Sequence, residues 1–365
     1  MLGRIVHSMS TVPSIAARRH AASPRRWVSE ELFDFWGTRL HPLWTLRRPL
    51  ARLVSRTAES ADAVTLVLTP NRHFRGLLPG QHVTLGVEVD GRRLSRSYSP
   101  TVLADGRLAI TVKAIAGGAV SQHLAGAAAI GEVFELGQAF GEMTLPTPSS
   151  ERLLLLAAGS GITPMRALLR QLDGAGMPGQ VDLVYWARRR EELCFADELA
   201  ALAARHPSFT LHIALTRDPA SPASRVDAFA FEALGDLSSA RVLVCGPGGF
   251  VDAAQARLQG QVASLQSEAF TPPVLPEAES GTVQVELRRS GRTLSLPRGT
   301  SLLQALEAEG LRPASGCRMG ICNTCVCGKV SGVTRHTLTG EHAAEPATQV
   351  KLCVNSASTD LILEL

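Results

Sequence analysis

The residues best suited to chemistry in this sequence are the cysteines of one short stretch, CRMGICNTCVC, which runs from Cys317 to Cys327. Three of its four cysteines follow the spacing C-x4-C-x2-C, and Cys353 lies 28 residues after the last of these three. A [2Fe–2S] cluster needs two thiolates on each iron besides the bridging sulfides, and three ligands on one loop with a distant fourth satisfy it. The spacing therefore predicts a [2Fe–2S] site with Cys317, Cys322, Cys325 and Cys353 as ligands.

The same stretch leaves a zinc site open as an alternative. Gly316 and Gly320 allow the loop to curl and to direct backbone N–H groups at the sulfurs, which suits an anionic cluster. Four cysteines including Cys327 could also bind zinc, but structural zinc ligands usually come as two separated pairs, and Cys353 would then have no role. The simpler interpretation of Cys327 is a small buried side chain. Without a secretory signal, seven cysteines favour metal or redox use in a reducing compartment over disulfides.

Length and charge exclude several classes of protein. The 365 residues suffice for two or three domains, and no apolar run approaches the length of a membrane span. Residues 1–29 carry five Arg and no acid, which leaves 32 basic and 33 acidic side chains for the remainder. A nearly neutral body argues against nucleic acid as a partner. The Arg-rich start is also typical of a mitochondrial transit peptide, but with 34 Arg and three Lys in the whole chain it carries little information.

The hydrophobic pattern changes along the chain and predicts a multidomain protein. Short alternating strands with Gly/Pro turns predict an antiparallel β-barrel, whereas strands that alternate with helices predict a parallel α/β sheet. A hairpin around Ser290-Gly291, a helix over 301–310 and the cysteine loop, with KLCVN as a strand-like segment, form a last α+β unit. A helix is also predicted over 191–206. The predicted segments are 1–47 (Arg/Trp-rich), 48–148 (barrel), 151–270 (α/β), 271–281 (linker) and 282–365 (cysteine domain).

Two short motifs lie in the β-rich part. RSYS spans Arg96–Ser99, and GGAVSQHL begins at Gly117. Either motif alone is weak, because RSYS fits a polar strand and GGAVS fits a turn with a helix cap.

Two glycine turns lie in the α/β part. AAGSGITPMRALL follows an apolar strand and opens a helix, so Gly159 and Gly161 let the chain approach a pyrophosphate at the helix N-terminus. Pro164 stands where the third glycine of GxGxxG would be, so this is not the Rossmann fingerprint. VCGPGGF contains Cys245, which also fits a buried cysteine at a strand end.

The turn WARRREEL follows the second α/β strand. A ribose 2′-group lies at this place in such folds, and arginine there suits a 2′-phosphate. Arg188 and Arg189 therefore favour NADPH, although a solvated basic turn before a helix would look the same.

Taken together, RSYS, GGAVS, GSGITP and CGPGG resemble the ferredoxin–NADP⁺ reductase superfamily, and SGCRMGICNTCVCGKVSG with Cys353 resembles the plant-type ferredoxin family, whose domain is a β-grasp fold. The order of motifs over about 48–365 is similar to that of three-domain oxygenase or desaturase reductases. The resemblance implies an NAD(P)H-dependent oxidoreductase that passes electrons through FAD and [2Fe–2S]. FAD is favoured over FMN by the form GGxVS.

The resemblance also implies roles for individual residues. Arg96 would pair with the flavin phosphates, Tyr98 would pack on the flavin, and Ser99 would reach towards its N5 atom. Thr163 and the Cys245-Gly246-Pro247 turn would approach the nicotinamide, with Glu268 near the contact of the two rings. The implied catalytic residues are Ser99, Cys245 and Glu268. The implied cofactor-binding residues are Arg96, Ser97, Tyr98, Ser99, Lys113, Gly117, Gly118, Val120, Ser121, Gly159, Gly161, Thr163, Pro164, Arg188, Arg189, Cys245, Gly246 and Pro247.

The electron acceptor is the least determined part of the function. FWGTRLHPLWTLRRPLARL, at the N-terminal side of the barrel, resembles a subgroup of bacterial reductases that serve membrane stearoyl-CoA desaturases. Trp, Phe and Arg together also suit contact of residues 27–48 with a membrane interface. For residues 30–46 the alternative is a helix packed on the body of the protein. For the electron acceptor the alternative is a soluble oxygenase of the phenylacetyl-CoA epoxidase or aromatic-ring hydroxylase type. For the function as a whole the alternative is an iron–sulfur redox sensor. We expect a cytoplasmic protein. A peripheral position at the inner face of the membrane is a further option for its location.

Overall fold

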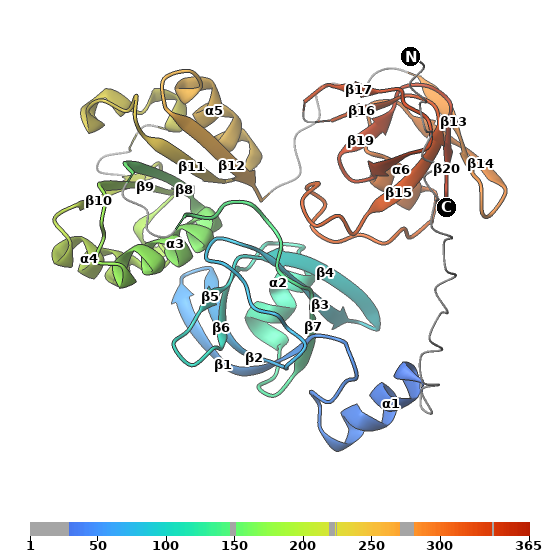
Figure 1. The fold of residues 1–365 in the computed structure, drawn as a ribbon, viewed down its shortest axis with the longest axis horizontal. Coiled ribbons are helices and arrows are strands. Elements are labelled where there is room, and N and C mark those ends of the chain that lie inside the picture. Colours follow the sequence, from blue (N-terminus) through green and yellow to red (C-terminus); the bar gives the residue numbers. More distant parts are fainter. Residues whose placement is uncertain (1–28, 147–150, 219–222, 224, 271–280, 338) are drawn as a thin grey trace, which may run out of the picture.

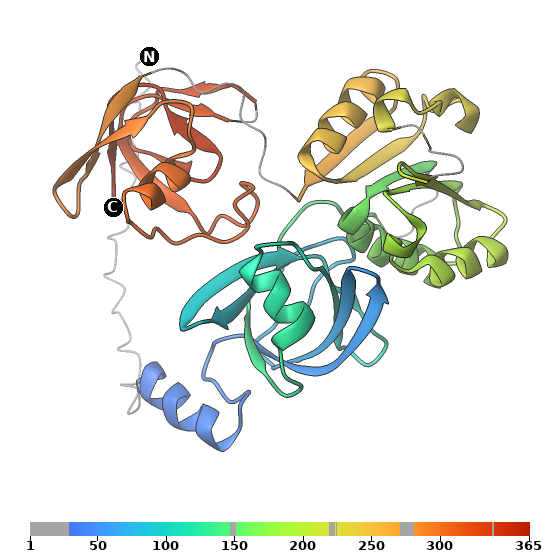
Figure 2. The same ribbon diagram turned by 180° about the vertical axis from the view of Figure 1, so that it is seen from behind.

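Three domains make up the chain in a computed structural model, which describes residues 29–146, 151–218, 223, 225–270, 281–337 and 339–365. The β-rich domain adjoins the other two, and a short N-terminal helix lies at its far end from the α/β domain (Figures 1 and 2). Residues 1–28, which include Trp27, and nearly all of the predicted linker lie outside the described residues.

The first domain is a curled antiparallel sheet of seven strands. Their order is β4-β3-β7-β1-β2-β6-β5, so β4 and β5 are its two ends and the sheet is an open half-barrel. Alternate side chains of β3 are buried in its interior, as the period of two predicts, whereas in β2 the neighbours Thr65 and Leu66 are both buried. The strands are β1 Leu50–Ser60, β2 Ala63–Pro70, β3 Val83–Val89, β4 Arg92–Tyr98, β5 Thr101–Val102, β6 Leu108–Lys113 and β7 Val133–Leu136, and the short helix α2 is Ala119–Gln122.

The second domain is a parallel five-stranded sheet in the order β10-β9-β8-β11-β12. The central strands β8 and β9 are buried almost throughout, because helices cover both faces of the sheet. The strands are β8 Leu153–Ala158, β9 Val181–Ala187, β10 Phe209–Leu215, β11 Arg241–Gly246 and β12 Ser264–Ala269. The helices are α3 Ile162–Gly174, α4 Ala196–Arg205 and α5 Gly248–Leu258.

The helix predicted over 191–206 was wrong in its first five residues. The helix α4 begins only at Ala196, because Phe195 adopts a left-handed conformation with φ 61°. The backbone N–H groups before it are engaged elsewhere: that of Cys194 donates to Tyr185 Oη at 3.1 Å, and that of Phe195 donates to Glu59 Oε1 at 2.9 Å. Tertiary contacts thus override the local helix preference of EELCF.

The third domain has a mixed sheet, β14-β13-β20-β15-β18, and a small second sheet, β17-β16-β19. The predicted hairpin is present, with Gly291 in the left-handed region at φ 65°. The strand predicted at KLCVN was wrong, because β18 ends at Lys351 and Cys353 lies in the turn before β19. The elements are β13 Thr282–Leu287, β14 Arg292–Pro297, α6 Leu302–Ala308, β15 Val326–Ser331, β16 Thr334–His336, β17 His342–Ala343, β18 Thr348–Lys351, β19 Asn355–Ala357 and β20 Leu361–Leu363.

The helix α1, Glu30–Leu40, begins at the N-cap Ser29, whose side chain accepts a hydrogen bond from the Leu32 backbone. The buried carboxylate of Asp34 anchors the helix to the half-barrel, since it accepts from Arg48 Nε at 2.8 Å and from the Leu46 backbone at 2.7 Å. None of the helices in the described ranges is both long and apolar enough to cross a membrane.

Candidate electron-transfer site

The cysteine loop arranges its thiols as two pairs. Cys317 and Cys322 exchange backbone N–H···Sγ hydrogen bonds at 3.2 and 3.3 Å, and the sulfurs of Cys325 and Cys353 lie 3.2 Å apart. The hydrogen bonds from Cys317 and Cys353 lower the pKa of Cys322 to about 5 and that of Cys325 to about 6, so one thiolate is favoured in each pair. Two pairs, each able to bind one iron, are the donor set that a binuclear cluster requires.

The backbone of this loop fits an anionic cluster. The N–H of Met319 donates to Cys317 Sγ at 3.4 Å, and the N–H of Gly320 donates to Cys353 Sγ at 3.2 Å. Gly320 has a φ of +76°, and a Cβ on Gly316 would lie 2.8 Å from Cys322 Sγ, so glycine is needed at both positions. The two glycines therefore allow the loop to close around the thiols.

The position of Cys327 does not favour the zinc alternative. Cys327 lies on β15 in the hydrophobic core of the third domain, opposite Val350 in the sheet. Its Sγ contacts the carbonyl oxygen of Gly328 at 3.4 Å, which agrees with the interpretation of a buried residue beside the cluster.

The RSYS residues end strand β4 and begin the turn that follows it. Arg96 is exposed, whereas Ser99 is buried. Burial raises the pKa of Tyr98, so its phenol stays neutral. Ser97 Oγ is buried and has no hydrogen-bond partner in the described chain, which fits an oxygen or nitrogen of a bound flavin as the missing partner.

The GGAVS residues form a turn and the start of helix α2. Gly117 has a φ of +74° and faces open space, and Gly118 is the N-cap of the helix. Ser121 Oγ accepts from the Ile115 backbone at 3.2 Å and donates to the Gly118 carbonyl at 3.0 Å. Val120 anchors the helix in the domain core. The turn therefore leaves room for a phosphate on its Gly117 side.

The two glycine turns of the α/β domain lie against each other. A Cβ on Gly161 would lie 1.9 Å from the Cys245 carbonyl oxygen, so only glycine fits where the first turn passes the second. Thr163 Oγ1 donates to the Ser160 carbonyl at 3.0 Å, and both Thr163 and Pro164 are buried in the first turn of α3. Gly159 faces open space, as a dinucleotide site requires.

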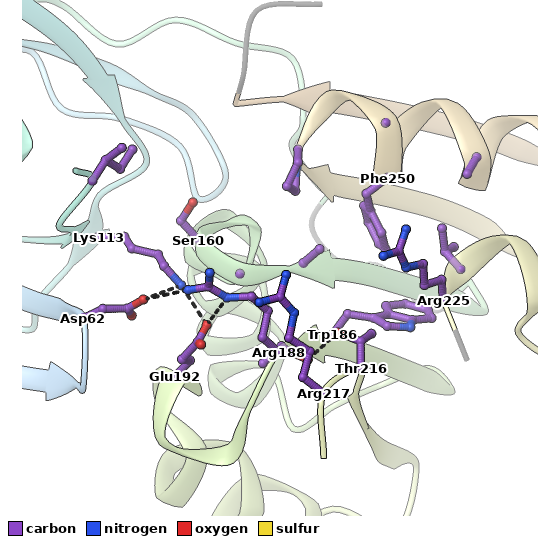
Figure 3. A pocket seen from close by; sticks show the side chains of 18 of the residues that line it. Asp62, Lys113, Ser160, Trp186, Arg188, Glu192, Thr216, Arg217, Arg225 and Phe250 are labelled. Carbon is purple, nitrogen blue, oxygen red and sulfur yellow. Dashed lines mark hydrogen bonds and ion pairs between the residues drawn. The ribbon is translucent and has the colours of Figure 1, made fainter. Parts of the chain in front are cut away.

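A cavity of about 820 Å³ opens between the first two domains, at the carboxyl ends of the parallel strands (Figure 3). Its size and place are those of a dinucleotide site in an α/β fold. Trp186 and Phe250 form an aromatic wall with their rings 5.2 Å apart. Of the predicted residues, those that line the cavity are Lys113, Gly159, Arg188 and Pro247.

The basic residues of this cavity divide into two groups. Lys113 and Arg188 are paired with the carboxylates of Asp62 and Glu192, at 2.8 Å for both Lys113–Asp62 and Arg188–Glu192. The other basic residues, Arg217 and Arg225, have no carboxylate within ion-pair distance in the described part of the chain. Figure 3 shows all four basic side chains around the same opening.

Of these four basic residues, the sequence motifs predicted only Lys113 and Arg188. Arg189 is not among the lining residues and lies 3.9 Å from Glu191 on the surface. Arg217 and Arg225, which follow the third strand, were missed. Because the carboxyl ends of neighbouring parallel strands meet at one edge, TRD after β10 was the signal that could have found Arg217.

The predicted catalytic residues lie together at the boundary of the two domains. Glu268 stands beside Cys245 in the register of β12 and β11, and burial together with this carboxylate raises the pKa of the Cys245 thiol. Glu268 Oε2 also lies 2.8 Å from Nε2 of His82, a residue of the half-barrel that no motif contains.

The cysteine domain contacts the half-barrel beside RSYS. Ser95 Oγ donates to the Ser315 carbonyl at 3.0 Å, which joins strand β4 to the residue two positions before Cys317. The predicted flavin and cluster residues are therefore neighbours in space. When bound, FAD accepts a hydride and returns its two electrons singly, and the cluster carries one electron at a time.

Comparisons with known proteins identify all three domains. Residues 50–144 match the oxidoreductase FAD-binding domain, residues 155–256 the oxidoreductase NAD-binding domain, and residues 285–355 the 2Fe-2S iron-sulfur cluster binding domain. The chain is 35% identical over 335 residues to an NADPH oxidoreductase of Mycobacterium tuberculosis, covering 89% of this chain and 86% of that protein.

Two further similar proteins are also reductases by name. The ferredoxin reductase component of a Mycobacterium tuberculosis 3-ketosteroid-9-alpha-monooxygenase is 32% identical, covering 77% of this chain and 84% of that protein. The structure of phthalate dioxygenase reductase, described as modular for electron transfer from pyridine nucleotides to [2Fe–2S], aligns with a TM-score of 0.58 and 27% identity, over 87% of this chain and 97% of that one. The chain therefore belongs to the ferredoxin–NADP⁺ reductase superfamily, as an oxidoreductase with FAD, NAD(P)H and a [2Fe–2S] cluster as its electron carriers.

Proposed function

We propose that the chain takes electrons from NADPH in preference to NADH and delivers them, through FAD and the cluster, to a membrane fatty-acyl desaturase. The preference for NADPH is supported by Arg217 and Arg225, two cavity arginines without carboxylate partners in the described residues. Arginine binds a phosphate through two parallel N–H donors, whereas the 2′-hydroxyl of NADH offers no charge to pair with. The name of the mycobacterial NADPH oxidoreductase supports the same donor.

The proposed boundaries and binding residues follow from the sequence motifs. We assign residues 48–148 to FAD, 151–270 to NADPH and 282–365 to the cluster, with the ligands Cys317, Cys322, Cys325 and Cys353. An anaerobic spectrum before and after one equivalent of NADPH tests this assignment. Flavin and iron–sulfur bands that both bleach with NADPH, and more slowly with NADH, are the expected result, whereas bleaching with NADH alone would contradict the donor.

The acceptor proposal rests on the outer face of helix α1. Leu32, Phe35, Trp36 and Leu40 share one side of the helix and are exposed, with Trp36 60% and Leu40 79% accessible. The opposite side carries Asp34, which fixes the helix to the half-barrel. An apolar face that points away from the core is unusual for a surface helix and marks an interaction site.

The chemistry of this face fits an anionic membrane surface. Trp44, also exposed, extends the apolar area beyond the helix. The guanidinium of Arg39 lies 3.4 Å from the Phe35 ring centre, and residues 1–28 add five more arginines and no acid. Aromatic side chains beside arginine favour the headgroup region of an anionic bilayer. We therefore place the protein in the cytoplasm, peripheral to the inner face of the membrane.

Replacement of both Trp36 and Trp44 by serine is expected to release the protein from phosphatidylglycerol vesicles. A large buried apolar side chain contributes roughly 1.5–3 kcal/mol, so the partition coefficient should fall about tenfold or more. Co-sedimentation measures it, and reduction of an artificial dye should be unchanged. Ile130→Ser, at an exposed apolar residue on the half-barrel, is the matched control. Equal sedimentation of all three proteins would contradict the membrane proposal.

The second candidate acceptor is a multicomponent oxygenase in solution. The names of the 3-ketosteroid-9-alpha-monooxygenase component and of phthalate dioxygenase reductase favour it. Electron delivery to a membrane-embedded desaturase, compared with delivery to a soluble oxygenase, separates the two candidates. The relatives' names are those of enzymes or enzyme components, which favours turnover over the redox-sensor alternative.

A further inference from the structure

The side chain of His82 connects the three predicted catalytic residues. Its Nδ1 lies 3.5 Å from Ser99 Oγ, and its Nε2 lies 2.8 Å from Glu268 Oε2. Glu268 in turn neighbours Cys245 across the β12–β11 pair. All four residues are buried, His82 with only 1% of its surface accessible. The row of side chains thus runs from the RSYS motif to the CGPGG motif.

The imidazole is held in one orientation. The backbone of His82 exchanges two hydrogen bonds with Phe140, at 2.8 and 3.0 Å. The rings of Phe140 and Phe270 pack on the imidazole with centres 5.8 and 6.0 Å away. Gly141 lies beside the pair, and a Cβ on it would be in van der Waals contact, at 3.6 Å, with both His82 Nδ1 and Glu268 Oε1. The ring therefore keeps one nitrogen towards each partner.

The pair between His82 and Glu268 joins two domains. His82 belongs to the half-barrel and Glu268 to the α/β sheet. His82 Nε2 and Glu268 Oε2 are both buried and have no other partner in the described chain, and the two atoms lie 2.8 Å apart. A carboxylate buried in this way costs stability unless it is paired. Because the pair bridges the half-barrel and the α/β sheet beside Ser99 and Cys245, it is placed to fix the relative position of these residues.

We propose that His82 is a positioning residue, which holds Ser99 and Glu268, and with them the two domains, in the arrangement required for hydride transfer from the nicotinamide to the flavin. The proposal rests on the reductase activity of the family and not on the choice of acceptor. His82 lies in none of the four motifs from which the other residues of the site were predicted.

The direct test is the rate at which NADPH reduces the flavin, measured in an anaerobic stopped-flow instrument without any acceptor. His82→Ala should slow this step roughly ten- to hundredfold, the cost of misplacing a reacting group by about 1 Å. The concentration of NADPH at half-maximal rate should change little, because His82 does not line the cavity. His82→Gln should recover part of the rate, since its amide is polar and able to contact Glu268.

The matched control is His206→Gln. His206 Nε2 lies 2.7 Å from Asp173 Oδ1, so this pair has the same chemistry but lies within the α/β domain. Flavin content and the unfolding midpoint establish that each variant is folded, and His82→Gln decides the question if His82→Ala fails to fold.

A second measurement does not depend on the cofactors. Hydrogen–deuterium exchange of the flavin-free protein should be faster at 140–143 and 266–270 in both His82 variants, and unchanged there in His206→Gln. Reduction rates and exchange equal to those of His206→Gln would overturn the proposal.

Discussion

Replacement of Cys353 by serine is expected to give a protein that keeps its flavin and loses its iron–sulfur absorption. Cys353 forms one of the two thiol pairs with Cys325, their sulfurs 3.2 Å apart, so its removal leaves one iron with a single thiolate. Iron content should fall from about two atoms per chain to near zero. Reduction of ferricyanide by NADPH should persist, because the flavin can supply it, whereas reduction of cytochrome c should be lost.

The control for this prediction is Cys327→Ser. Cys327 is equally buried but belongs to the core of the third domain, and its Sγ contacts the carbonyl of Gly328. A hydroxyl there costs roughly 1–3 kcal/mol of stability at most and leaves both thiol pairs intact. The iron content of this variant should equal that of the parent protein. Loss of iron in Cys327→Ser with retention in Cys353→Ser would contradict the ligand set and return zinc as an alternative.

The iron–sulfur domain was predictable because most of its signal is local. Cys317, Cys322 and Cys325 lie within nine residues, and glycines at fixed positions in the same loop make the curl possible. The alternating strands of the half-barrel and the buried strands of the α/β domain were predictable for the same reason, since their periods lie within one segment.

The features that were predicted wrongly or not at all lie where segments distant in the sequence come into contact. Phe195 is left-handed because its backbone N–H donates to Glu59, which lies 136 residues earlier. His82 stands alone before a strand and acquires meaning only when the α/β sheet brings Glu268 within 2.8 Å. Arg217 joins Arg188 because adjacent parallel strands end at one edge, and its backbone N–H donates to the Arg188 carbonyl at 2.8 Å. A single sequence does not reveal such contacts.

Replacement of Arg217 by alanine is expected to weaken NADPH binding far more than NADH binding. Arg188 already has two carboxylates near it, Glu192 at 2.8 Å and Asp62 at 3.5 Å, so a phosphate must compete with them for its guanidinium. Arg217 has no such competitor in the described residues. A hydrogen bond to a charged group contributes roughly 1.5–3 kcal/mol, which corresponds to a ten- to hundredfold rise in the Michaelis constant for NADPH.

The comparison that decides this prediction uses the neighbouring arginines. Arg189→Ala removes an exposed side chain outside the cavity and should leave both Michaelis constants within about twofold of the parent, an effect typical of surface charges. Arg188→Ala should give an intermediate effect, because its loss leaves Asp62 and Glu192 with Lys113 as their cation and so makes the opening more negative for a phosphate. The Michaelis constant for NADH should stay nearly constant throughout. If Arg189→Ala has the larger effect, or if both nucleotides are affected equally by Arg217→Ala, then the phosphate does not bind at the end of β10 and the preference for NADPH has another origin.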